Sequence, residues 1–386
     1  MNYNRKNRNS STLTIHVMCA IVFVLFSLSW LFFFQADVMA MTQHQLSGGL
    51  THYNKVAGAL IITVALYLLQ LAVYAVVRLK KRTHALTYVP SMLILAMLTD
   101  VSQQIAFDGD MIHTVSWWLV VLVAIIWLGV IWLARQLQEM EDDDSYSLIS
   151  RPMWINMLVM ALQIMGVAWL GSTHAVFHYR MQTENYLTQG DYDNALQVGK
   201  KSLESDKHLL MLRMYALART DGLGEHLFEY PISGTSSEVL PTNNKTMMLL
   251  CSTDSLYRFF GARPKENMEP VRYLQMLQRR NSAPQKTVGD YLLCCDLIDK
   301  NLDHFAQEVG RYYTINEKLP KHYREALTLY THLRSNPLFA YQYSVTEEDF
   351  DNFRAMEQEY PSLSERKGKV GEQYRDTYWY YYGYGQ

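Results

Sequence analysis

The pattern of apolar and polar positions changes near His174. Before that residue the chain is built of long apolar blocks joined by short polar stretches, and after it apolar residues recur at helical spacing among charged residues and tyrosines. Each block is close to the ~20 residues that a helix needs to cross a bilayer. The blocks are Leu13–Phe34, Val56–Val77, Leu86–Phe107, Val115–Ala134 and Met153–Thr173.

This pattern predicts an all-α protein. We expect a bundle of about five transmembrane helices over residues 1–174, a soluble helical domain over 175–360 and an aromatic-rich tail over 361–386. The first block follows Arg5, Lys6 and Arg8, as in a signal peptide, but its apolar run is too long for one. We therefore interpret it as an uncleaved anchor.

Basic residues in the short connections predict the orientation. They gather before the first block and at Arg78–Arg82, whereas the stretches after the first and third blocks are poor in them. The N-terminus is therefore expected in the cytoplasm and the C-terminal domain across the membrane. Whether Leu86–Phe107 spans fully stays open, because its second half is polar. If it only dips into the interface, the C-terminal domain would lie in the cytosol.

The connection after the first block contains candidate chemistry. It carries Asp37, His44 and His52, which are residue types suited to acid–base or metal chemistry. Their spacing matches no standard ligand motif, and a polar re-entry loop capped by Gly48 and Gly49 is the simpler interpretation. Asp100, near the outer end of the third block, is the remaining acidic candidate. No metal site and no cofactor is predicted.

The cysteines do not form a metal motif either. Cys19 lies in an apolar block, and no CxxC pair occurs. In an oxidising compartment Cys251 could pair with Cys294 or Cys295. Buried free thiols are the favoured alternative.

The stretch ENYLTQGDYDNALQVGKKSLESD resembles the tetratricopeptide repeat. The resemblance places Tyr179 and Tyr186 on a first helix, Gly190 at the turn, and Tyr192, Ala195 and Leu203 on a second helix. A weaker unit later in the chain would place Asn301 at the turn and Ala306 at the small position. Such repeats imply a short solenoid with a groove for a peptide or protein. A generic helical bundle is the alternative.

Several stretches together resemble a family of uncharacterised multi-span membrane proteins typical of the Bacteroidota. They are QHQLSGGLTHYN, QGDYDNAL, LPKHYREALTLY and YRDTYWYYY. This resemblance implies no activity, ligand or catalytic residue. A Gram-negative envelope would make the outer compartment the periplasm.

The tail poses a separate question, because clustered aromatic residues usually pack against another surface, and the sequence does not show which one. Its glycines are expected to break helices and its aromatic residues to favour extended structure. It could pack back on the repeats, lie on the membrane interface, or be recognised by a partner. The aromatic residues are Tyr378, Trp379, Tyr380, Tyr381 and Tyr382, and the glycines are Gly368, Gly371, Gly383 and Gly385.

The net charge of −2 gives no global field that attracts nucleic acid. No nucleotide-binding, hydrolase or zinc-protease motif is found. The leading prediction is a non-enzymatic inner-membrane protein whose periplasmic helical domain scaffolds or recruits another envelope protein. The alternative is a membrane enzyme acting on lipid-linked or glycan substrates at the outer face, using Asp37, His44, His52 or Asp100.

Overall fold

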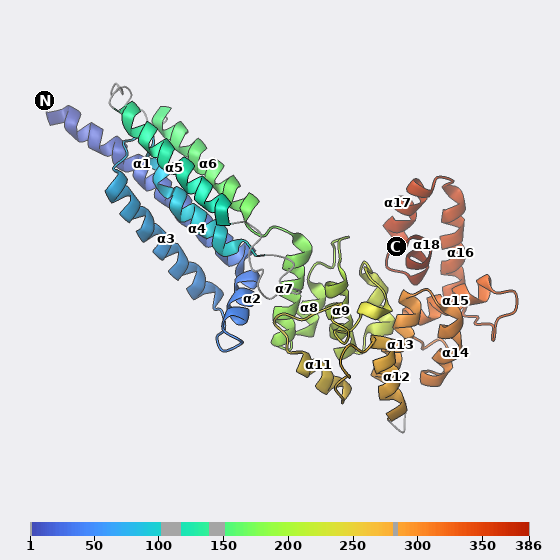
Figure 1. Cartoon of the computed structure of the whole chain (residues 1–386). Helices are drawn as coiled ribbons and strands as arrows, with labels where there is room; N and C mark the ends of the chain where they lie inside the picture. Colours follow the sequence, from blue (N-terminus) through green and yellow to red (C-terminus); the bar gives the residue numbers. More distant parts are fainter. Residues whose placement is uncertain (1, 102–116, 139–150, 281–284, 386) are drawn as a thin grey trace. The chain divides into compact units, whose positions relative to one another are not determined.

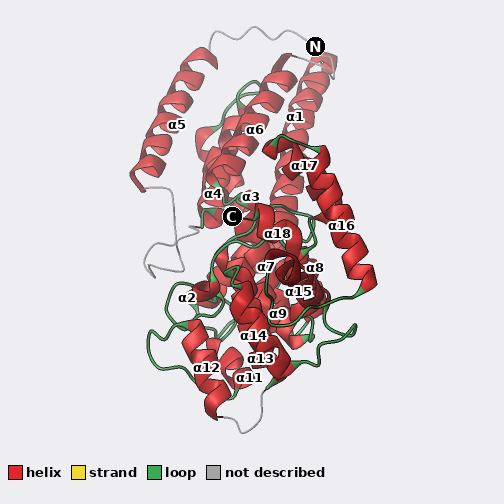
Figure 2. Cartoon of the chain, turned by 90° about the vertical axis from the view of Figure 1, so that its right-hand side faces the viewer, coloured by secondary structure: helices red, strands yellow, loops and turns green. Residues whose placement is uncertain are grey.

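The computed structural model describes residues 2–101, 117–138, 151–280 and 285–385. The chain divides into two compact units, Met1–His174 and Ala175–Gln386, which are described one at a time. Every regular element in the described ranges is helical, in agreement with the predicted all-α class (Figure 2).

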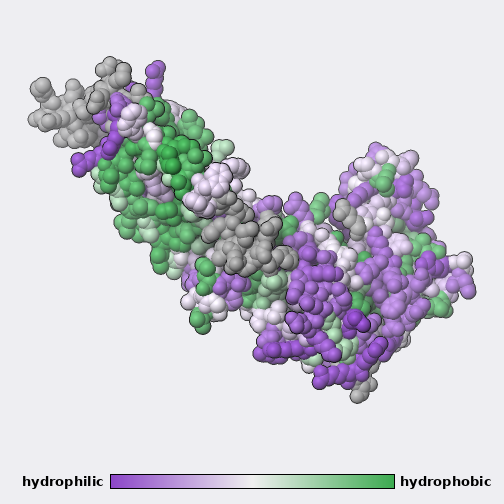
Figure 3. Space-filling view, viewed as in Figure 1, coloured by the Kyte–Doolittle hydropathy of each residue, from purple (hydrophilic) through white to green (hydrophobic). Residues whose placement is uncertain are grey.

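The first unit is a bundle of apolar helices (Figure 1). Among the described residues, apolar ones cover most of its visible face (Figure 3), as expected for a bundle surrounded by lipid. The elements are α1 (Asn2–Ser29), a π-helical continuation η1 (Trp30–Phe34), α2 (Ala36–Leu46), α3 (Lys55–Val77), the 3-10 helix η2 (His84–Tyr88), α4 (Val89–Thr99), α5 (Trp117–Gln138) and α6 (Arg151–Leu170).

Within the described residues, four helices are long and apolar enough to cross a membrane. They are Thr12–Phe34, Lys55–Val77, Trp117–Gln136 and Arg151–Leu170. The chain is therefore a multi-pass membrane protein. These four segments coincide with four of the five predicted blocks, although residues 115–116 of the fourth block lie outside the described residues.

The third block differs from its prediction. It forms a shorter apolar helix, His84–Thr99, rather than one helix over Leu86–Phe107. The chain leaves the helix at Asp100, whose ψ is 87°, where the sequence turns polar. Residues 102–107 lie outside the described residues.

This short segment nevertheless reaches both ends of α6. At one end the amide of Ala85 donates to Asn156 Oδ1 at 2.7 Å, and at the other the amide of Ser172 donates to the Thr99 carbonyl at 2.8 Å. The two segments therefore run side by side in the same direction. Since η2 winds as a 3-10 helix, which rises faster per residue, His84–Thr99 extends about 26 Å.

Contacts with α1 show that it runs in this direction too. The His16 ring stacks on the His84 ring at 3.8 Å between centroids, and Trp30 Nε1 donates to Thr99 Oγ1 at 3.2 Å. One end of α1 therefore lies beside His84 and its other end beside Thr99.

The helices α3 and α5 run the opposite way. In α3, Gln70 donates to Thr87, and the earlier residue Leu66 accepts from the later residue Ser91. Near the C-terminus of α5, the Arg135 guanidinium donates to the Val77 carbonyl at 2.8 Å, where α3 ends. The end of the bundle that holds His84 therefore also holds the C-terminal ends of α3 and α5.

The connection after the first span is not the polar loop that the sequence predicts. Residues 36–46 form α2, and the turn follows at Gly48 and Gly49, whose φ values of 59° and 81° favour glycine. The sequence predicted a loop capped by these glycines, but it did not predict the helix before them.

The second unit is a series of helices and short turns. They are α7 (Ala175–Thr188), α8 (Tyr192–Gln197), α9 (Lys207–Arg219), α10 (Leu223–His226), η4 (Leu227–Glu229), η5 (Ser236–Glu238), α11 (Thr253–Phe260), α12 (Pro270–Arg280), α13 (Lys286–Ile298), α14 (Leu302–Tyr312), α15 (Lys321–Leu333), α16 (Ser344–Glu359), α17 (Leu363–Tyr374) and α18 (Tyr378–Tyr384). Hydrophilic residues cover most of its visible face (Figure 3).

The first proposed repeat contains a helical hairpin, α7 and α8, with Gly190 at the turn (φ 73°) and Ala195 buried. Its second helix is shorter than predicted. It ends at Gln197, because Gly199 adopts φ 61° and the Tyr179 ring occupies the space of a side chain there. Leu203, predicted on that helix, lies outside it and is 63% exposed. Tyr186 and Tyr192 pack half-buried against the core.

The later hairpin, α13 and α14, also departs from its prediction. Lys300 takes the left-handed turn position (φ 57°), and Asn301 instead caps α14 by accepting the His304 amide at 3.2 Å. Asparagine is among the best N-cap residues, which accounts for the shift by one position. Ala306 is buried, as a close approach of two helices requires.

The proposed disulfide is not formed. Cys251, Cys294 and Cys295 are free thiols, and Cys294 and Cys295 are buried in α13. Cys251 is half-buried beside the Glu184 carbonyl. Burial raises the pKa of the Cys294 thiol above its usual range, so it stays protonated.

Candidate functional site

The C-terminal tail is helical, which corrects the prediction of extended structure. Gly368 and Gly371 lie inside α17, and Gly383 lies inside α18; only Gly385 follows the end of a helix. The intrinsic preference of aromatic residues for strands is overridden here by burial and by capping. Thr377 caps α18 by accepting the Tyr380 amide at 3.2 Å.

The aromatic residues of α18 pack on the rest of their unit. Tyr378, Trp379 and Tyr381 are buried, whereas Tyr380 and Tyr382 are half-buried. The Tyr381 hydroxyl donates to the Ile298 carbonyl at 2.7 Å, and Trp379 Nε1 donates to the Glu325 carbonyl at 2.8 Å. The Tyr378 hydroxyl donates to the Leu297 carbonyl at 3.3 Å, so each polar side-chain atom of the three buried rings has a partner, as a stable core requires.

Helix α15 receives this tail through its first two turns. Glu325 Oε2 accepts the Tyr378 amide at 2.7 Å and lies 3.0 Å from His322 Nδ1. His322 Nε2 accepts the Phe228 amide, so the ring proton sits on Nδ1 and is donated to Glu325. Lys321 pairs with Asp376 at 2.9 Å. The distinctive stretches LPKHYREAL and DTYWYYY are therefore in direct contact.

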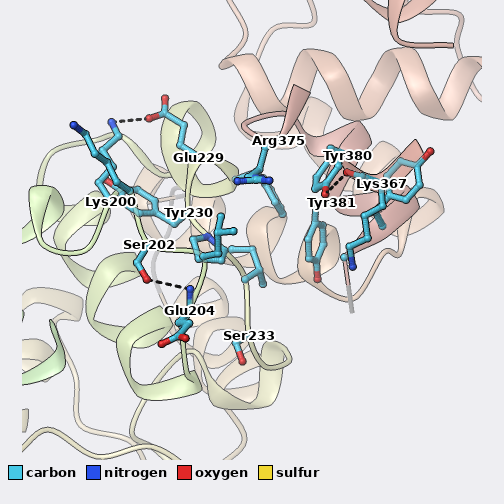
Figure 4. Close-up of a pocket in the computed structure, with 18 of the residues that line it drawn as sticks. Lys200, Ser202, Glu204, Glu229, Tyr230, Ser233, Lys367, Arg375, Tyr380 and Tyr381 are labelled. Carbon is cyan, nitrogen blue, oxygen red and sulfur yellow. Dashed lines mark hydrogen bonds and ion pairs between the residues drawn. The ribbon is translucent and has the colours of Figure 1, made fainter. Parts of the chain in front are cut away.

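The docked tail forms one side of a cavity of about 1020 Å³, which we call the tail cleft (Figure 4). Its other sides come from the turns after α8 and around η4. Its polar and aromatic lining includes Lys200, Lys201, Ser202, Glu204, Glu229, Tyr230, Ser233, Lys367, Arg375, Tyr380, Tyr381 and Tyr384.

One ion pair in the tail cleft is already formed. Lys200 Nζ lies 2.9 Å from Glu229, and this hydrogen bond raises the pKa of Lys200. Burial acts to raise the pKa of Glu229, but the hydrogen bonds from His226 and Lys200 hold it below its usual value. Both groups therefore stay charged at neutral pH and offset one another.

The other cations of the tail cleft are not offset in this way. Lys201, Lys367 and Arg375 are exposed, and their charged groups have no hydrogen-bond or ion-pair partner among the described residues. Against four basic side chains the lining holds the two acidic side chains of Glu204 and Glu229. The cleft is therefore net positive and partly walled by tyrosine rings, which suits an extended ligand that carries negative charge.

The side chains predicted as a site are distributed over the first unit. Asp37 and His44 share α2 but are two turns apart, about 10 Å along the axis. His52 is exposed in the irregular segment before α3, and Asp100 is only 2% exposed at the end of α4. No group of three or more His, Cys, Asp or Glu residues in the described part of the chain could hold a metal ion.

Sequence reasoning did not identify the tail cleft. It singled out the aromatic tail, but not Lys201, Lys367 or Arg375, because these residues come from segments far apart in the chain. The adjacent pairs Lys200–Lys201 and Arg366–Lys367 are the signal that could have found it.

Comparison with known proteins gives one match. A model described as a family of unknown function (DUF6057) matches residues 108–260 and 266–385, which is more than half of the chain. No curated protein and no solved structure matches the chain.

Proposed function

The chain belongs to DUF6057, a family of unknown function, and on that premise we propose a binding function for this membrane protein. The multi-pass first unit anchors the second unit at the outer, periplasmic face of a bacterial inner membrane. There the tail cleft holds an extended acidic segment of another envelope protein. The protein is in this view a scaffold that recruits its partner without catalysing a reaction.

The single observation that carries this proposal is the set of uncompensated cations in the tail cleft. Lys201, Lys367 and Arg375 line a cavity of about 1020 Å³ that tyrosine rings also line. Arginine and tyrosine are enriched where proteins bind proteins. Tyrosine gives a large contact with two rotatable bonds to order, and the planar guanidinium of arginine pairs with carboxylates through two hydrogen bonds. A cavity of this volume is at the upper end of small-ligand sites and accommodates several residues of an extended chain.

The second support is the route of the chain through the bundle. The segment His84–Thr99 runs beside α6 from the level of Asn156 to Ser172, so it traverses the bundle although it is short. Together with the four long helices it makes five traversals. An odd number of crossings leaves the N-terminus and the second unit on opposite sides of the membrane.

The third support is the distribution of basic residues. The bundle end that holds His84 also carries nearly all basic residues of the connections, whereas the opposite end carries Asp37, Lys55 and Asp100. Positive residues mark the cytoplasmic end, so the chain enters the second unit on the other side. The basic residues are Arg78, Lys80, Lys81, Arg82, Arg135 and Arg151.

The helical hairpins of the second unit fit this role. The pairs α7–α8 and α13–α14 each bury a small residue at the crossing, Ala195 and Ala306, as tetratricopeptide-like hairpins do. We propose that they are degenerate repeats, and that the docked tail closes the end of the array as a cap does in solenoids.

Site-specific photocrosslinking in cells tests this function. A photoreactive residue replaces Leu203, which lines the tail cleft and is 63% exposed, or Leu338, which does not line it and is 64% exposed. A discrete protein adduct is expected at position 203 and not at 338. The adduct should disappear in Lys367→Glu/Arg375→Glu.

The control for a charge reversal outside the site is Lys265→Glu, at an exposed lysine of the same unit that does not line the tail cleft. This variant should keep the adduct. An adduct that persists in Lys367→Glu/Arg375→Glu, or that is lost equally in Lys265→Glu, would contradict the proposal.

A further inference from the structure

The membrane unit contains a second cavity that the binding function does not use. It is a groove of about 550 Å³ between α1 and α3, with η2 as its floor, and we call it the α1–α3 groove. This volume is within the range of about 300–1,000 Å³ that is usual for ligand sites. Its lining is Leu13, His16, Val17, Ala20, Ile21, Val24, Leu25, Tyr67, Gln70, Leu71, Tyr74, His84 and Tyr88.

The floor of the α1–α3 groove presents buried polar atoms that lack partners. Gln70 is 1% exposed and His84 is 2% exposed. The Gln70 amide nitrogen donates to Thr87 at 3.0 Å, but its oxygen Oε1 has no hydrogen-bond partner in the described part of the protein, and neither has His84 Nδ1. Each such group costs about 1–3 kcal/mol when it is left unsatisfied, and the lipid around the bundle offers little water.

Ring contacts hold this polar floor in place. The His16 ring stacks on His84, and the Tyr74 ring meets both at 5.1 Å in an edge-on arrangement. His16 Nε2 is a further buried nitrogen without a hydrogen-bond partner in the described ranges. Three hydrogen-bonding atoms without partners, from two helices and η2, therefore lie buried at the floor of the groove.

The rest of the α1–α3 groove is apolar. Along α1 it extends from Leu13 to Leu25, about 18 Å at 1.5 Å per residue. The rims are exposed at Ile21 and Leu71, so the groove is open along its length. An alkyl chain can pack along such an open apolar groove, whereas a wholly polar ligand would lose its hydration there without gaining hydrogen bonds.

Positive charge lies next to the polar floor. Tyr74 is one helical turn before Arg78, and His84 follows Arg82 by two residues. The segment Arg78–Arg82 contains four basic residues, of which Arg78 and Lys80 are exposed. Basic residues at the end of a bundle attract anionic head groups.

We propose that the α1–α3 groove is a specific site for one anionic glycerophospholipid. One acyl chain lies along Leu13–Leu25, and the phosphate lies toward Arg78–Arg82. Hydroxyl and ester groups of the lipid reach Gln70, His84 and His16. The lipid thereby satisfies the three buried polar atoms that the protein leaves without partners.

Native mass spectrometry of the full chain, delipidated in detergent, tests this site. The probes are phosphatidylglycerol and phosphatidylethanolamine with identical acyl chains. One equivalent of phosphatidylglycerol is expected to remain bound, with affinity about tenfold above that of phosphatidylethanolamine. Ala20→Trp, which fills the groove, should weaken binding about tenfold. Val121→Trp, at an exposed position of α5 outside the groove, should not.

A second variant keeps the test decisive if Ala20→Trp does not fold. Arg78→Gln/Lys80→Gln leaves the groove lining unchanged and should remove the preference for phosphatidylglycerol. Equal retention of the two lipids by the unmodified chain would indicate annular lipid only and overturn the proposal. Equal binding by Ala20→Trp and Val121→Trp, or an unchanged preference in Arg78→Gln/Lys80→Gln, would overturn it as well.

Discussion

The carboxylate of Glu325 accepts the backbone amide of Tyr378 at 2.7 Å across 53 positions of sequence. Glu325 also lies 3.0 Å from His322 Nδ1, and its own carbonyl accepts Trp379 Nε1. One residue of α15 thus holds the first two residues of the last helix. These contacts hold the aromatic tail against α15. They also position the tail as one side of the tail cleft.

Removing the Glu325 carboxylate should loosen the tail. In Glu325→Ala the buried Tyr378 amide and His322 Nδ1 lose their acceptor, which costs about 1–3 kcal/mol per unsatisfied group. Hydrogen exchange in residues 376–385 should accelerate, while α7 keeps its protection. Glu372→Ala removes an exposed carboxylate of α17 and is the matched control. Unchanged exchange in the tail of Glu325→Ala would contradict this account.

Deleting Tyr378–Gln386 should destabilise the second unit, because the deletion exposes Phe228, Phe350 and Phe353. Trp379→Ala alone should lower the free energy of unfolding by about 3–5 kcal/mol. Trp379→Phe retains most of the packing and should lower the free energy of unfolding by clearly less. Pulse proteolysis of the full chain in detergent across a urea series measures both. A deletion that leaves the midpoint unchanged would favour a tail that serves only a partner.

The stability of the second unit should fall at mildly acidic pH through His208. Burial, together with the nearby positive charges of Arg180 and Lys207, lowers the pKa of His208 from 6.5 to about 3. Below pH 6.5 the unfolded chain binds a proton that the folded chain does not. The contribution of neutral His208 to the free energy of unfolding is therefore complete above pH 6.5. It is lost as the pH falls toward 3, by up to about 1.4 kcal/mol per pH unit.

The matched variant is His208→Asn, because an amide oxygen can accept the Met247 amide as His208 Nδ1 does. The difference in unfolding free energy between this variant and the original chain should change with pH between 6.5 and about 4. Because the other titrating groups are the same in both chains, their effects on the unfolding free energy cancel in this difference. A difference independent of pH would show that folding does not lower the pKa of His208.

Replacing the outer-loop candidates should leave partner binding intact. Asp37, His44 and His52 do not line the tail cleft. The triple alanine variant should give the same photocrosslink at position 203 and the same cellular phenotype as the original chain. Loss of phenotype with the crosslink retained would favour the membrane enzyme that the sequence offered as the alternative.

Hydropathy predicted the four long spans because a membrane span is a local property of about 20 residues. It misjudged the third block, whose length depends on the 3-10 winding of η2 and on the exit of the chain at Asp100. Both features are stabilised by contacts with residues remote in sequence, such as Asn156 and Ser172.

The same reasoning applies to the tail and the cleft. Aromatic residues and glycines favour a non-helical tail locally, and the acceptor that reverses this preference, Glu325, is 53 positions away. The tail cleft combines Lys201 with Lys367 and Arg375, which only the packed second unit brings together. Its composition therefore could not be predicted from one stretch of sequence.

The most direct test of the account is the side of the membrane on which the second unit lies. Leu203→Cys and Lys80→Cys place single exposed thiols in the second unit and at the basic bundle end. In spheroplasts, a membrane-impermeant maleimide should label the thiol at position 203 and should label the one at position 80 only after lysis. The unmodified chain reports the background from its own cysteines. Labelling at position 80 with protection at position 203 would contradict five crossings and the periplasmic binding function.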